Sequence, residues 1–284
     1  MTPPGGDGID VVAPARRPET VGRLLEALAR GDRRPDLVSL VGHEVPLSID
    51  TRGLPVRLLR PRSKHYAVGE QDVALRRNVG AWASPLPWLV FLDDDVVPAR
   101  DTLSSCARLL ADAPVVWGHH RFLDLRATPV QAVLALPASA GRSRELGVNR
   151  WHGWASCYGG MLAVHRATFL AAGGYDMAYS GRHAGEDQDL GRRLARGLQG
   201  TDRVFIHEPP YAWHPVVPEP WAAPGWTNLC AHGHREVSAR VDGLAVLRCE
   251  ACPWFRVVGD PPQTGLAPCL PFAYGQVDVE IFAL

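Results

Sequence analysis

Trp88-Leu89-Val90-Phe91-Leu92-Asp93-Asp94-Asp95 is an apolar run that ends in three consecutive carboxylates. A short apolar run of this kind predicts a buried strand. Like charges crowded at its end repel one another, so they are best tolerated where a cation offsets them. A second acidic segment, Gly185-Glu186-Asp187-Gln188-Asp189-Leu190, follows about ninety residues later. Together the two segments favour an enzyme that uses a divalent metal ion.

The 284 residues suffice for one large domain with a small appendage, or for two modest domains. A formal net charge of zero gives no electrostatic reason to expect a nucleic-acid partner. The N-terminus lacks the basic and apolar regions of a signal peptide, and no apolar run approaches the roughly 18 residues of a membrane span. Six scattered cysteines do not form a disulfide framework for a chain of this length. We therefore expect a cytoplasmic protein without a transmembrane segment.

Strand patterns and helix patterns alternate along the first three quarters of the chain, which predicts a mainly parallel α/β sheet. In such sheets ligands bind beyond the carboxyl ends of the strands, where Asp93 to Asp95 would lie. Prolines become dense after residue 207, so we place a boundary near residue 216, between a domain of residues 1–215 and an appendage of residues 216–284. Strands are expected at 9–12, 37–41, 56–59, 88–92, 115–117, 160–164 and 204–207, and helices from 19 onward and at 70–82, 102–110, 168–172 and 187–198.

Four sequence pieces occur in an order that resembles a GT-A glycosyltransferase. Arg16 and Arg17 follow the first strand, and Arg77-Asn78-Val79-Gly80 resembles the RNxG segment of the family 2 enzymes. Asp93-Asp94-Asp95 resembles the D-x-D motif, and residues 159–190 resemble the GG…GGYD…GEDxDL block of galactosyltransferase-type enzymes. Each piece alone is weak, but their order and spacing are specific. The resemblance implies a Rossmann-like GT-A fold over residues 1–215 and an inverting transfer from a nucleotide-diphosphate sugar, a UDP-sugar by preference.

The resemblance assigns the donor side of this site to the first strands. Asp95 would be the main ligand of Mn²⁺ or Mg²⁺, Asp93 would contact the metal or the ribose, and Asp94 would point towards the nucleotide or back into the scaffold. Arg16 and Arg77 would bind the donor. A histidine often completes the metal shell, and we favour His214 over His207. The chain departs from the family after the second strand, where Glu44 is a candidate to replace the acidic residue that reads the base.

On the acceptor side, the resemblance makes Asp187 the base that deprotonates a hydroxyl or an amine, with Glu186 orienting the acceptor. A plain helix N-cap is the competing interpretation of either residue taken alone. Asp189 either supports the site or lies on a solvated helix face. Tyr175 and Asp176 resemble acceptor-binding positions, and the remaining acceptor candidates are Gly160 and Trp154, which is equally suited to a core. The sequence does not identify the acceptor beyond a small molecule or a carrier-bound group, or the sugar beyond a hexosyl or N-acetylhexosaminyl residue.

The C-terminal part contains a candidate zinc site. Residues 235–247 alternate as in a hairpin, and cysteines and histidines flank them at the spacing of a zinc ribbon. The expected ligands of this structural Zn²⁺ are Cys230, Cys249, Cys252 and one of His232 and His234. Reduced thiols in a small β appendage are the alternative. Such a module would brace the active site or dock a carrier protein.

Three other functions compete with this interpretation. A nucleotidyltransferase would have a glycine-rich phosphate loop after the first strand, and Ala13-Pro14-Ala15-Arg16-Arg17 is not one. A non-catalytic protein that binds sugar nucleotides or a carrier protein would not need the base Asp187. A glycosyltransferase of polysaccharides or lipid-linked glycans stays possible, although no anchor segment points to it.

Overall fold

The structure is a computed structural model. It describes residues 7–63, 73–123, 128–136, 142–143, 161–175, 186–197, 204–215, 236–241, 244–249, 255–257 and 277–284. Within these ranges, the side chains of 63, 119–123, 142–143, 188, 189, 192, 195–197, 204–215, 236–257 and 277 are not described.

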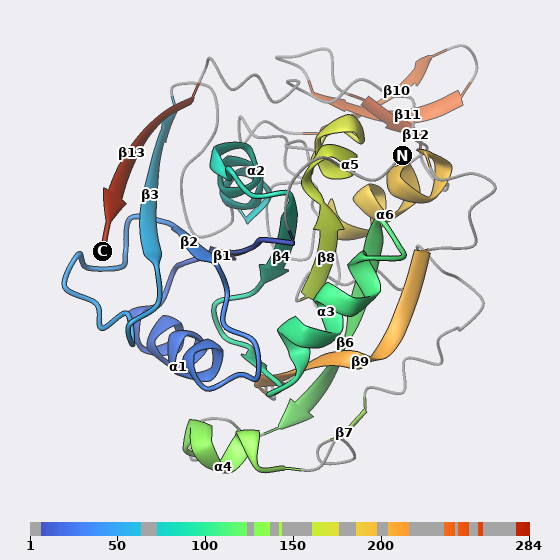
Figure 1. Ribbon diagram of the computed structural model, residues 1–284. Helices are drawn as coiled ribbons and strands as arrows, with labels where there is room; N and C mark the ends of the chain where they lie inside the picture. Colours follow the sequence, from blue (N-terminus) through green and yellow to red (C-terminus); the bar gives the residue numbers. More distant parts are fainter. Residues whose placement is uncertain are drawn as a thin grey trace.

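A ten-stranded mixed sheet forms the centre of the molecule (Figure 1). Its order is β13-β3-β2-β1-β4-β8-β6-β9-β5, with β7 paired to β6. The strands are β1 (Ile9–Pro14), β2 (Leu37–Val41), β3 (Val56–Ser63), β4 (Trp88–Leu92), β5 (Val97–Pro98), β6 (Val115–Leu123), β7 (Arg142–Ser143), β8 (Met161–His165), β9 (Val204–Pro215) and β13 (Val277–Ala283).

The first four long strands, β3, β2, β1 and β4, run parallel to one another, so their carboxyl ends meet at one edge of the sheet. β8 lies antiparallel between β4 and β6, and β6 pairs in parallel with β9. The helices that connect these strands are α1 (Pro18–Ala29), α2 (Val73–Ala83), α3 (Thr102–Leu110), α4 (Val130–Leu134), α5 (Arg166–Ala171) and α6 (Glu186–Gly197).

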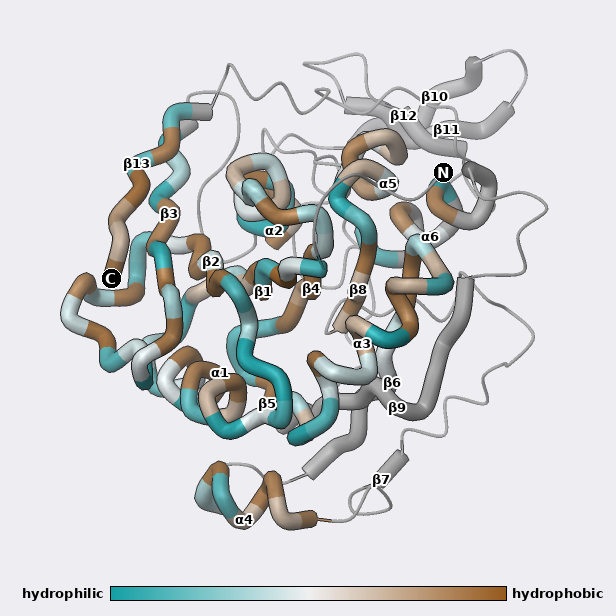
Figure 2. The backbone as a smooth tube through the Cα atoms, in the orientation of Figure 1, coloured by the Kyte–Doolittle hydropathy of each residue, from teal (hydrophilic) through white to brown (hydrophobic). Residues whose placement is uncertain are grey.

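Two apolar cores lie on the two faces of the sheet, because successive strand residues point to opposite sides. Val11 and Val90 face α1 and α3, whereas Val12 and Phe91 face α2, α5 and α6. β4 and β8 are hydrophobic along most of their length (Figure 2), as strands covered on both faces should be. The apolar run that precedes the aspartates is therefore anchored from both sides, with all five of its residues buried.

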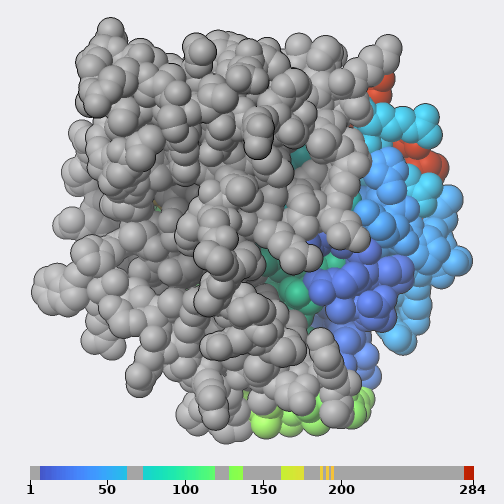
Figure 3. Space-filling model, turned by 180° about the vertical axis from the view of Figure 1, so that it is seen from behind, coloured from blue at the N-terminus to red at the C-terminus, as the bar shows by residue number. Residues whose placement is uncertain are grey.

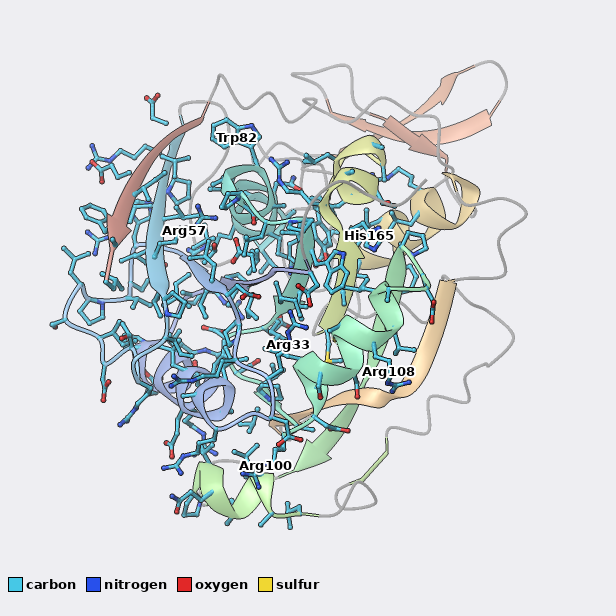
Figure 4. All side chains as sticks on the ribbon, viewed as in Figure 1. Arg33, Arg57, Trp82, Arg100, Arg108 and His165 are labelled. Atoms are coloured by element: carbon cyan, nitrogen blue, oxygen red, sulfur yellow. The ribbon has the colours of Figure 1, made fainter. Side chains whose placement is uncertain are left out.

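A buried ion pair holds the opposite end of the parallel strands. Arg57 of β3, labelled in Figure 4, lies 3.1 Å from Asp10 of β1, whose side chain is fully buried. Ser39 of β2 donates to both oxygens of Asp10, and Arg57 also donates to the carbonyl of Ala83 at the end of α2. These contacts fix α2 against the sheet at the end remote from the aspartates.

The expected strands and helices of residues 9–123 are present and begin within about three residues of their predicted starts, but β6 continues to Leu123 instead of ending at 117, and β9, expected at 204–207, continues to Pro215. The structure adds several short elements that the sequence patterns did not indicate, among them β5, α4 and β7. In the C-terminal part, the predicted hairpin is confirmed: β10 (Glu236–Val241) pairs antiparallel with β11 (Leu244–Cys249), and β12 (Phe255–Val257) joins them.

The last strand corrects one part of the expected domain organisation. β13 pairs antiparallel with β3 over its whole length, from Val277 opposite Ser63 to Ala283 opposite Arg57. It therefore belongs to the large sheet and not to the appendage assigned to residues 216–284. From behind, the N-terminal strands and β13 lie along one side of the molecule and α4 lies at its lower edge (Figure 3). None of the helices within the described ranges is long and apolar enough to cross a membrane.

Candidate active site at the carboxyl edge of the sheet

The three aspartates form a turn directly after β4. The backbone N–H of Val96 donates to the carbonyl of Asp93 at 3.4 Å, which closes this turn. Since β1, β2 and β4 are parallel, the turn lies beside Arg16 and Arg17 after the neighbouring β1, and Glu44 follows β2, one strand farther along the same edge. The sheet thus brings the predicted donor-side residues to one edge.

Asp94 is the structural member of the three aspartates. Its side chain is fully buried, and one carboxylate oxygen accepts the backbone N–H groups of Arg16 and Arg17 at 2.9 and 3.0 Å. Its other oxygen accepts from the Arg17 guanidinium at 2.9 Å and from that of Arg16 at 3.4 Å. Of the two orientations considered for Asp94, the structure has the one that points back into the scaffold. Asp94 therefore ties the end of β4 to the end of β1.

Asp95 lies beside Arg17. The Nη2 atom of Arg17 is 2.7 Å from Oδ2 of Asp95, and the Asp95 side chain is 13% exposed. Burial favours the neutral form of Arg17, but Asp94 and Asp95 outweigh it and raise the pKa of the guanidinium. This pair places a positive charge at the carboxylate that the sequence motif assigns to the metal.

Arg77 joins the two halves of the predicted site. This side chain of α2 is only 2% exposed, and its Nη2 lies 2.6 Å from Oδ1 of Asp93 while its Nη1 lies 3.3 Å from Oε1 of Glu186. Although burial opposes the charged form, Tyr175, Asp93, Glu186 and Asp187 raise the pKa of Arg77. A single buried cation therefore connects the D-x-D segment with the acidic start of α6.

The aromatic ring of Tyr175 packs against the guanidinium of Arg77. The guanidinium carbon of Arg77 lies 5.0 Å from the centre of the Tyr175 ring, within the range of a cation–π interaction. Asn78 holds the Tyr175 backbone by donating to its carbonyl at 2.7 Å and accepting its N–H at 2.8 Å. Gly174 makes this approach possible, because its φ is +67° and a Cβ there would lie 2.6 Å from Oδ1 of Asn78. Tyr175, which resembles an acceptor-binding position in the sequence, is buried in the core with 1% exposure.

Glu186 and Asp187 are the first two residues of α6. Burial, followed by the charge of Asp187, raises the pKa of Glu186 to about 8, although Arg77 opposes the shift. Like-charged carboxyls that share a site seldom ionise together. Glu186 is thus the member of the pair that holds a proton near neutral pH.

Arg76 is a site residue that the sequence analysis missed. It is buried and pairs with both oxygens of Glu44, through Nη1 at 2.8 Å and Nη2 at 2.9 Å. Burial opposes ionisation of Glu44, but the hydrogen bonds and charge of Arg76 lower its pKa to about 2. Arg76 also donates to the carbonyl of Ala15, and Gly42 permits this contact because a Cβ there would lie 2.0 Å from that oxygen. The sequence feature that could have identified Arg76 is the pair of adjacent arginines in the otherwise apolar helix 73–83.

The charges at this edge suit a divalent cation. Glu186 holds its proton, and among the other described groups carboxylates still outnumber guanidiniums: Glu44, Asp93, Asp94, Asp95 and Asp187 stand against Arg16, Arg17, Arg76 and Arg77. Asp93 and Asp95 offer the hard oxygen atoms that Mn²⁺ and Mg²⁺ prefer, and both are partly exposed, at 22% and 13%. Within the described side chains, no group of three or more His, Cys, Asp or Glu residues is arranged to hold a metal ion by itself. Two carboxylates suffice where substrate phosphates and waters complete the shell.

The register of β9 distinguishes the two histidine candidates. β9 pairs with β5 so that Trp213 lies opposite Val97, which brings the next residue, His214, alongside the end of the aspartate turn. His207 lies opposite Gly118 of β6, farther along the sheet. The backbone of His214, and not that of His207, therefore lies next to the predicted metal ligands.

Several predicted residues lie outside the described part of the chain. These are Trp154, Gly160, Asp176, Cys230, His232, His234 and Cys252. Asp189 and Cys249 are placed by their backbone alone, in α6 and at the end of β11. The acceptor side beyond Glu186 and Asp187, and the zinc site, thus stay predictions.

Solved structures of S. aureus TarS share this fold. The TarS 1–349 structure matches with a TM-score of 0.52 and 14% identity, over 73% of this chain and 60% of that one. Its complex with UDP-GlcNAc matches with a TM-score of 0.51 and 15% identity, over 75% and 60% of the two chains. Its complex with UDP matches with a TM-score of 0.50 and 15% identity, over 74% and 61%.

The fold is the predicted α/β fold of the GT-A type. This chain spans about three fifths of the TarS 1–349 chain that it matches. No protein-family model matches the chain, and no curated protein matches its sequence. At identities of 14–15% the likeness shows the fold alone.

Proposed function

We propose that this protein is a metal-dependent, inverting glycosyltransferase that moves a sugar from a UDP-sugar to a hydroxyl or an amine. The observation that carries the proposal is the position of Arg77, which contacts Asp93 and Glu186 at once. This contact joins the carboxylates that suit a donor site to those that suit proton transfer from an acceptor. A binding protein needs only the first set.

The donor is argued from the fold and from the charges. TarS, which shares the fold, has been solved with UDP-GlcNAc and with UDP. We therefore favour UDP as the nucleotide and an N-acetylhexosamine as the sugar. Glu44, whose low pKa keeps it ionised, is the candidate to bind the nucleoside, because it lies after β2 at the same edge.

Asp93, Asp95 and His214 would hold Mn²⁺ or Mg²⁺ at this edge. Such an ion, when bound, neutralises the charge that develops on the diphosphate as the glycosyl bond breaks. Asp94 contributes indirectly, since its hydrogen bonds to the backbone of Arg16 and Arg17 fix the turn that presents its two neighbours.

Asp187 is the proposed base. Its carboxylate accepts the proton of the acceptor hydroxyl or amine as that oxygen or nitrogen attacks the anomeric carbon, and the bond from that carbon to the UDP oxygen breaks. Glu186, which holds its own proton near neutral pH, can donate a hydrogen bond that orients the acceptor. Arg77 keeps Glu186 close to Asp93, and so keeps the acceptor carboxylates close to the donor.

Slow release of UDP from UDP-GlcNAc in Mn²⁺, without an added acceptor, tests this function before the acceptor is known. We expect the wild type to release UDP and Asp187→Asn to lose at least about 100-fold in rate while binding UDP with nearly the same affinity. Equal hydrolysis by Asp187→Asn would show that the base is wrongly assigned. Binding of UDP-GlcNAc without any turnover by the wild type would favour a non-catalytic sugar-nucleotide binding protein.

A further inference from the structure

Arg17 is held between two aspartates by a single nitrogen. Its Nη2 atom lies 2.9 Å from Oδ1 of Asp94 and 2.7 Å from Oδ2 of Asp95. The Nε atom of Arg17 is buried but has no hydrogen-bond partner among the described residues, and the side chain as a whole is 42% exposed. A guanidinium that uses one of its three nitrogens in this way forgoes the bidentate geometry that makes arginine–carboxylate pairs strong.

The backbone of Arg17 is fixed independently of its guanidinium. Its N–H donates to Oδ2 of Asp94, beside the N–H of Arg16, and its carbonyl accepts from the backbone N–H of Val21 in the first turn of α1. The guanidinium can therefore leave Asp95 by a change of side-chain rotamer, without moving the turn after β1. The main chain is the fixed part and the exposed side chain is the movable part.

A divalent ion and this guanidinium cannot both be well placed at Asp95. A metal on Oδ2 would take the position of Nη2, since Mg²⁺ and Mn²⁺ bind carboxylate oxygens at about 2.0–2.2 Å. A metal on the other oxygen would still share one carboxylate with the guanidinium, and like charges that close together repel strongly in a partly buried site. The two cations thus compete for one carboxylate.

We propose that Arg17 gates the metal site: the ion displaces its guanidinium from Asp95, and the freed guanidinium then binds the donor diphosphate. This inference rests on the proposed function, since it requires a divalent ion at Asp95. Arginine suits the second role because its planar fork pairs with phosphate oxygens. The gate would couple metal binding to donor binding, because each ligand favours the same position of one side chain.

The first test measures Mn²⁺ binding to the full-length protein without nucleotide. Binding is monitored as the loss of the free Mn²⁺ signal in electron paramagnetic resonance. Arg17→Gln removes the guanidinium that competes with Mn²⁺ for Asp95, so it should tighten Mn²⁺ binding about fivefold. Asp95→Asn should weaken Mn²⁺ binding at least tenfold. Arg16→Gln is the matched control, since it removes the same charge from the neighbouring residue, whose guanidinium contacts Asp94 at 3.4 Å. We expect it to change Mn²⁺ affinity less than twofold.

The second test is UDP binding by calorimetry in saturating Mn²⁺. Arg17→Gln should bind UDP about tenfold more weakly than the wild type, although it binds Mn²⁺ more tightly. Opposite changes in the two affinities cannot arise from partial unfolding, which would weaken both. A merely structural ion pair would leave Mn²⁺ affinity unchanged or reduced in Arg17→Gln.

The outcomes separate this gate from the function it rests on. If the wild type binds Mn²⁺ but Arg17→Gln shows no gain, or if Arg16→Gln gains equally, the gate is wrong and the metal site stands. If the wild type binds no Mn²⁺ even with UDP present, the metal site and the gate both fail.

Discussion

Tyr175 contributes its ring, and not its hydroxyl, to the site. The ring packs edge-on against Phe91, with centroids 5.6 Å apart, and lies under Arg77, whereas the buried hydroxyl has no hydrogen-bond partner among the described residues. We therefore expect Tyr175→Phe to change the free energy of unfolding by less than about 1 kcal/mol, and in the stabilising direction if at all. Urea denaturation measures this.

Tyr175→Leu provides the comparison, because it removes the aromatic face. We expect it to cost about 2 kcal/mol or more of stability and to lower UDP release together with it, since Arg77 loses its support between Asp93 and Glu186. A Tyr175→Phe protein as impaired as Tyr175→Leu would show that the hydroxyl has a partner and a function of its own.

Glu186 makes the stability of the protein depend on pH. Its pKa rises from 4.5 in the unfolded chain to about 8 in the folded one, so the folded state holds a proton that the unfolded state has already released between these values. Its contribution to stability therefore falls as pH rises from about 4.5 to 8. Glu186→Gln removes this dependence, and its gain in the free energy of unfolding relative to the wild type should grow from near zero at about pH 4 to well over about 1 kcal/mol at pH 8.

Urea denaturation of the two proteins across this range is the measurement, with the exposed Glu19→Gln on α1 as the control. The other titrating groups are present in both proteins, so their contributions cancel in the difference between the two free energies of unfolding. A difference that is flat with pH, or that grows as pH falls, would contradict the raised pKa of Glu186.

At the residue scale, motif order was enough to name Arg77, Asp93, Asp95 and Glu186, because each belongs to a segment with a specific pattern. The side-chain partners of these residues could not be predicted from the sequence. Glu44 and Arg76 are 32 residues apart, and nothing in either segment indicates that their side chains meet. The burial of Asp94 was equally hidden, since it depends on two backbone N–H groups after another strand.

At the scale of elements, close packing of α2 on β1 sets the position of Arg77. Gly80 lies in α2 where a Cβ would be 2.3 Å from Cγ1 of the buried Val12. Gly80→Ala should therefore destabilise the protein by about 1–3 kcal/mol, in spite of the better helix propensity of alanine.

Gly22 of α1 is the matched control, because a Cβ there would meet no atom within 4 Å. Gly22→Ala should stabilise the protein by about 0.5–1 kcal/mol through helix propensity alone. Thermal unfolding of the two variants compares them directly. Stabilisation by Gly80→Ala as well as by Gly22→Ala would mean that α2 does not pack on β1 as closely as the structure has it.

The elements around this helix were largely predictable from periodicity and turn residues. Gly173-Gly174 ends α5: the N–H of Gly173 donates to the carbonyl of Leu170 at 3.0 Å, and both glycines have positive φ. The antiparallel direction of β8 between β4 and β6 was not predictable, because strand composition carries no information about direction. β5 was missed because it has only two residues.

At the scale of the whole molecule, β13 closes the sheet from the far end of the chain. Phe282 packs against the apolar core, with its ring 5.2 Å from the guanidinium carbon of Arg60, whereas the adjacent Ile281 is 58% exposed. We expect Phe282→Ala to cost about 1–3 kcal/mol and Ile281→Thr to change stability by less than about 0.5 kcal/mol. Two separate unfolding transitions, with only a minor one sensitive to Phe282→Ala, would contradict the inclusion of β13 in the large sheet.

The pairing of β13 with β3 could not be foreseen from the sequence. More than two hundred residues separate the two strands, and the dense prolines and the cysteine and histidine pattern between them suggested a separate appendage. The GT-A fold was predictable because its segments recur in a fixed order, whereas a strand that returns from the C-terminal part follows no such pattern.

The central claim is that the carboxyl edge of the sheet is a metal-dependent UDP-sugar site, and calorimetric titration of UDP into the protein tests it most directly. We expect wild-type protein to bind UDP at least about tenfold more tightly in Mn²⁺ than in EDTA, and Asp95→Asn to lose that difference while staying folded. Equal UDP affinity in Mn²⁺ and EDTA, or an unchanged Mn²⁺ effect in Asp95→Asn, would contradict the account.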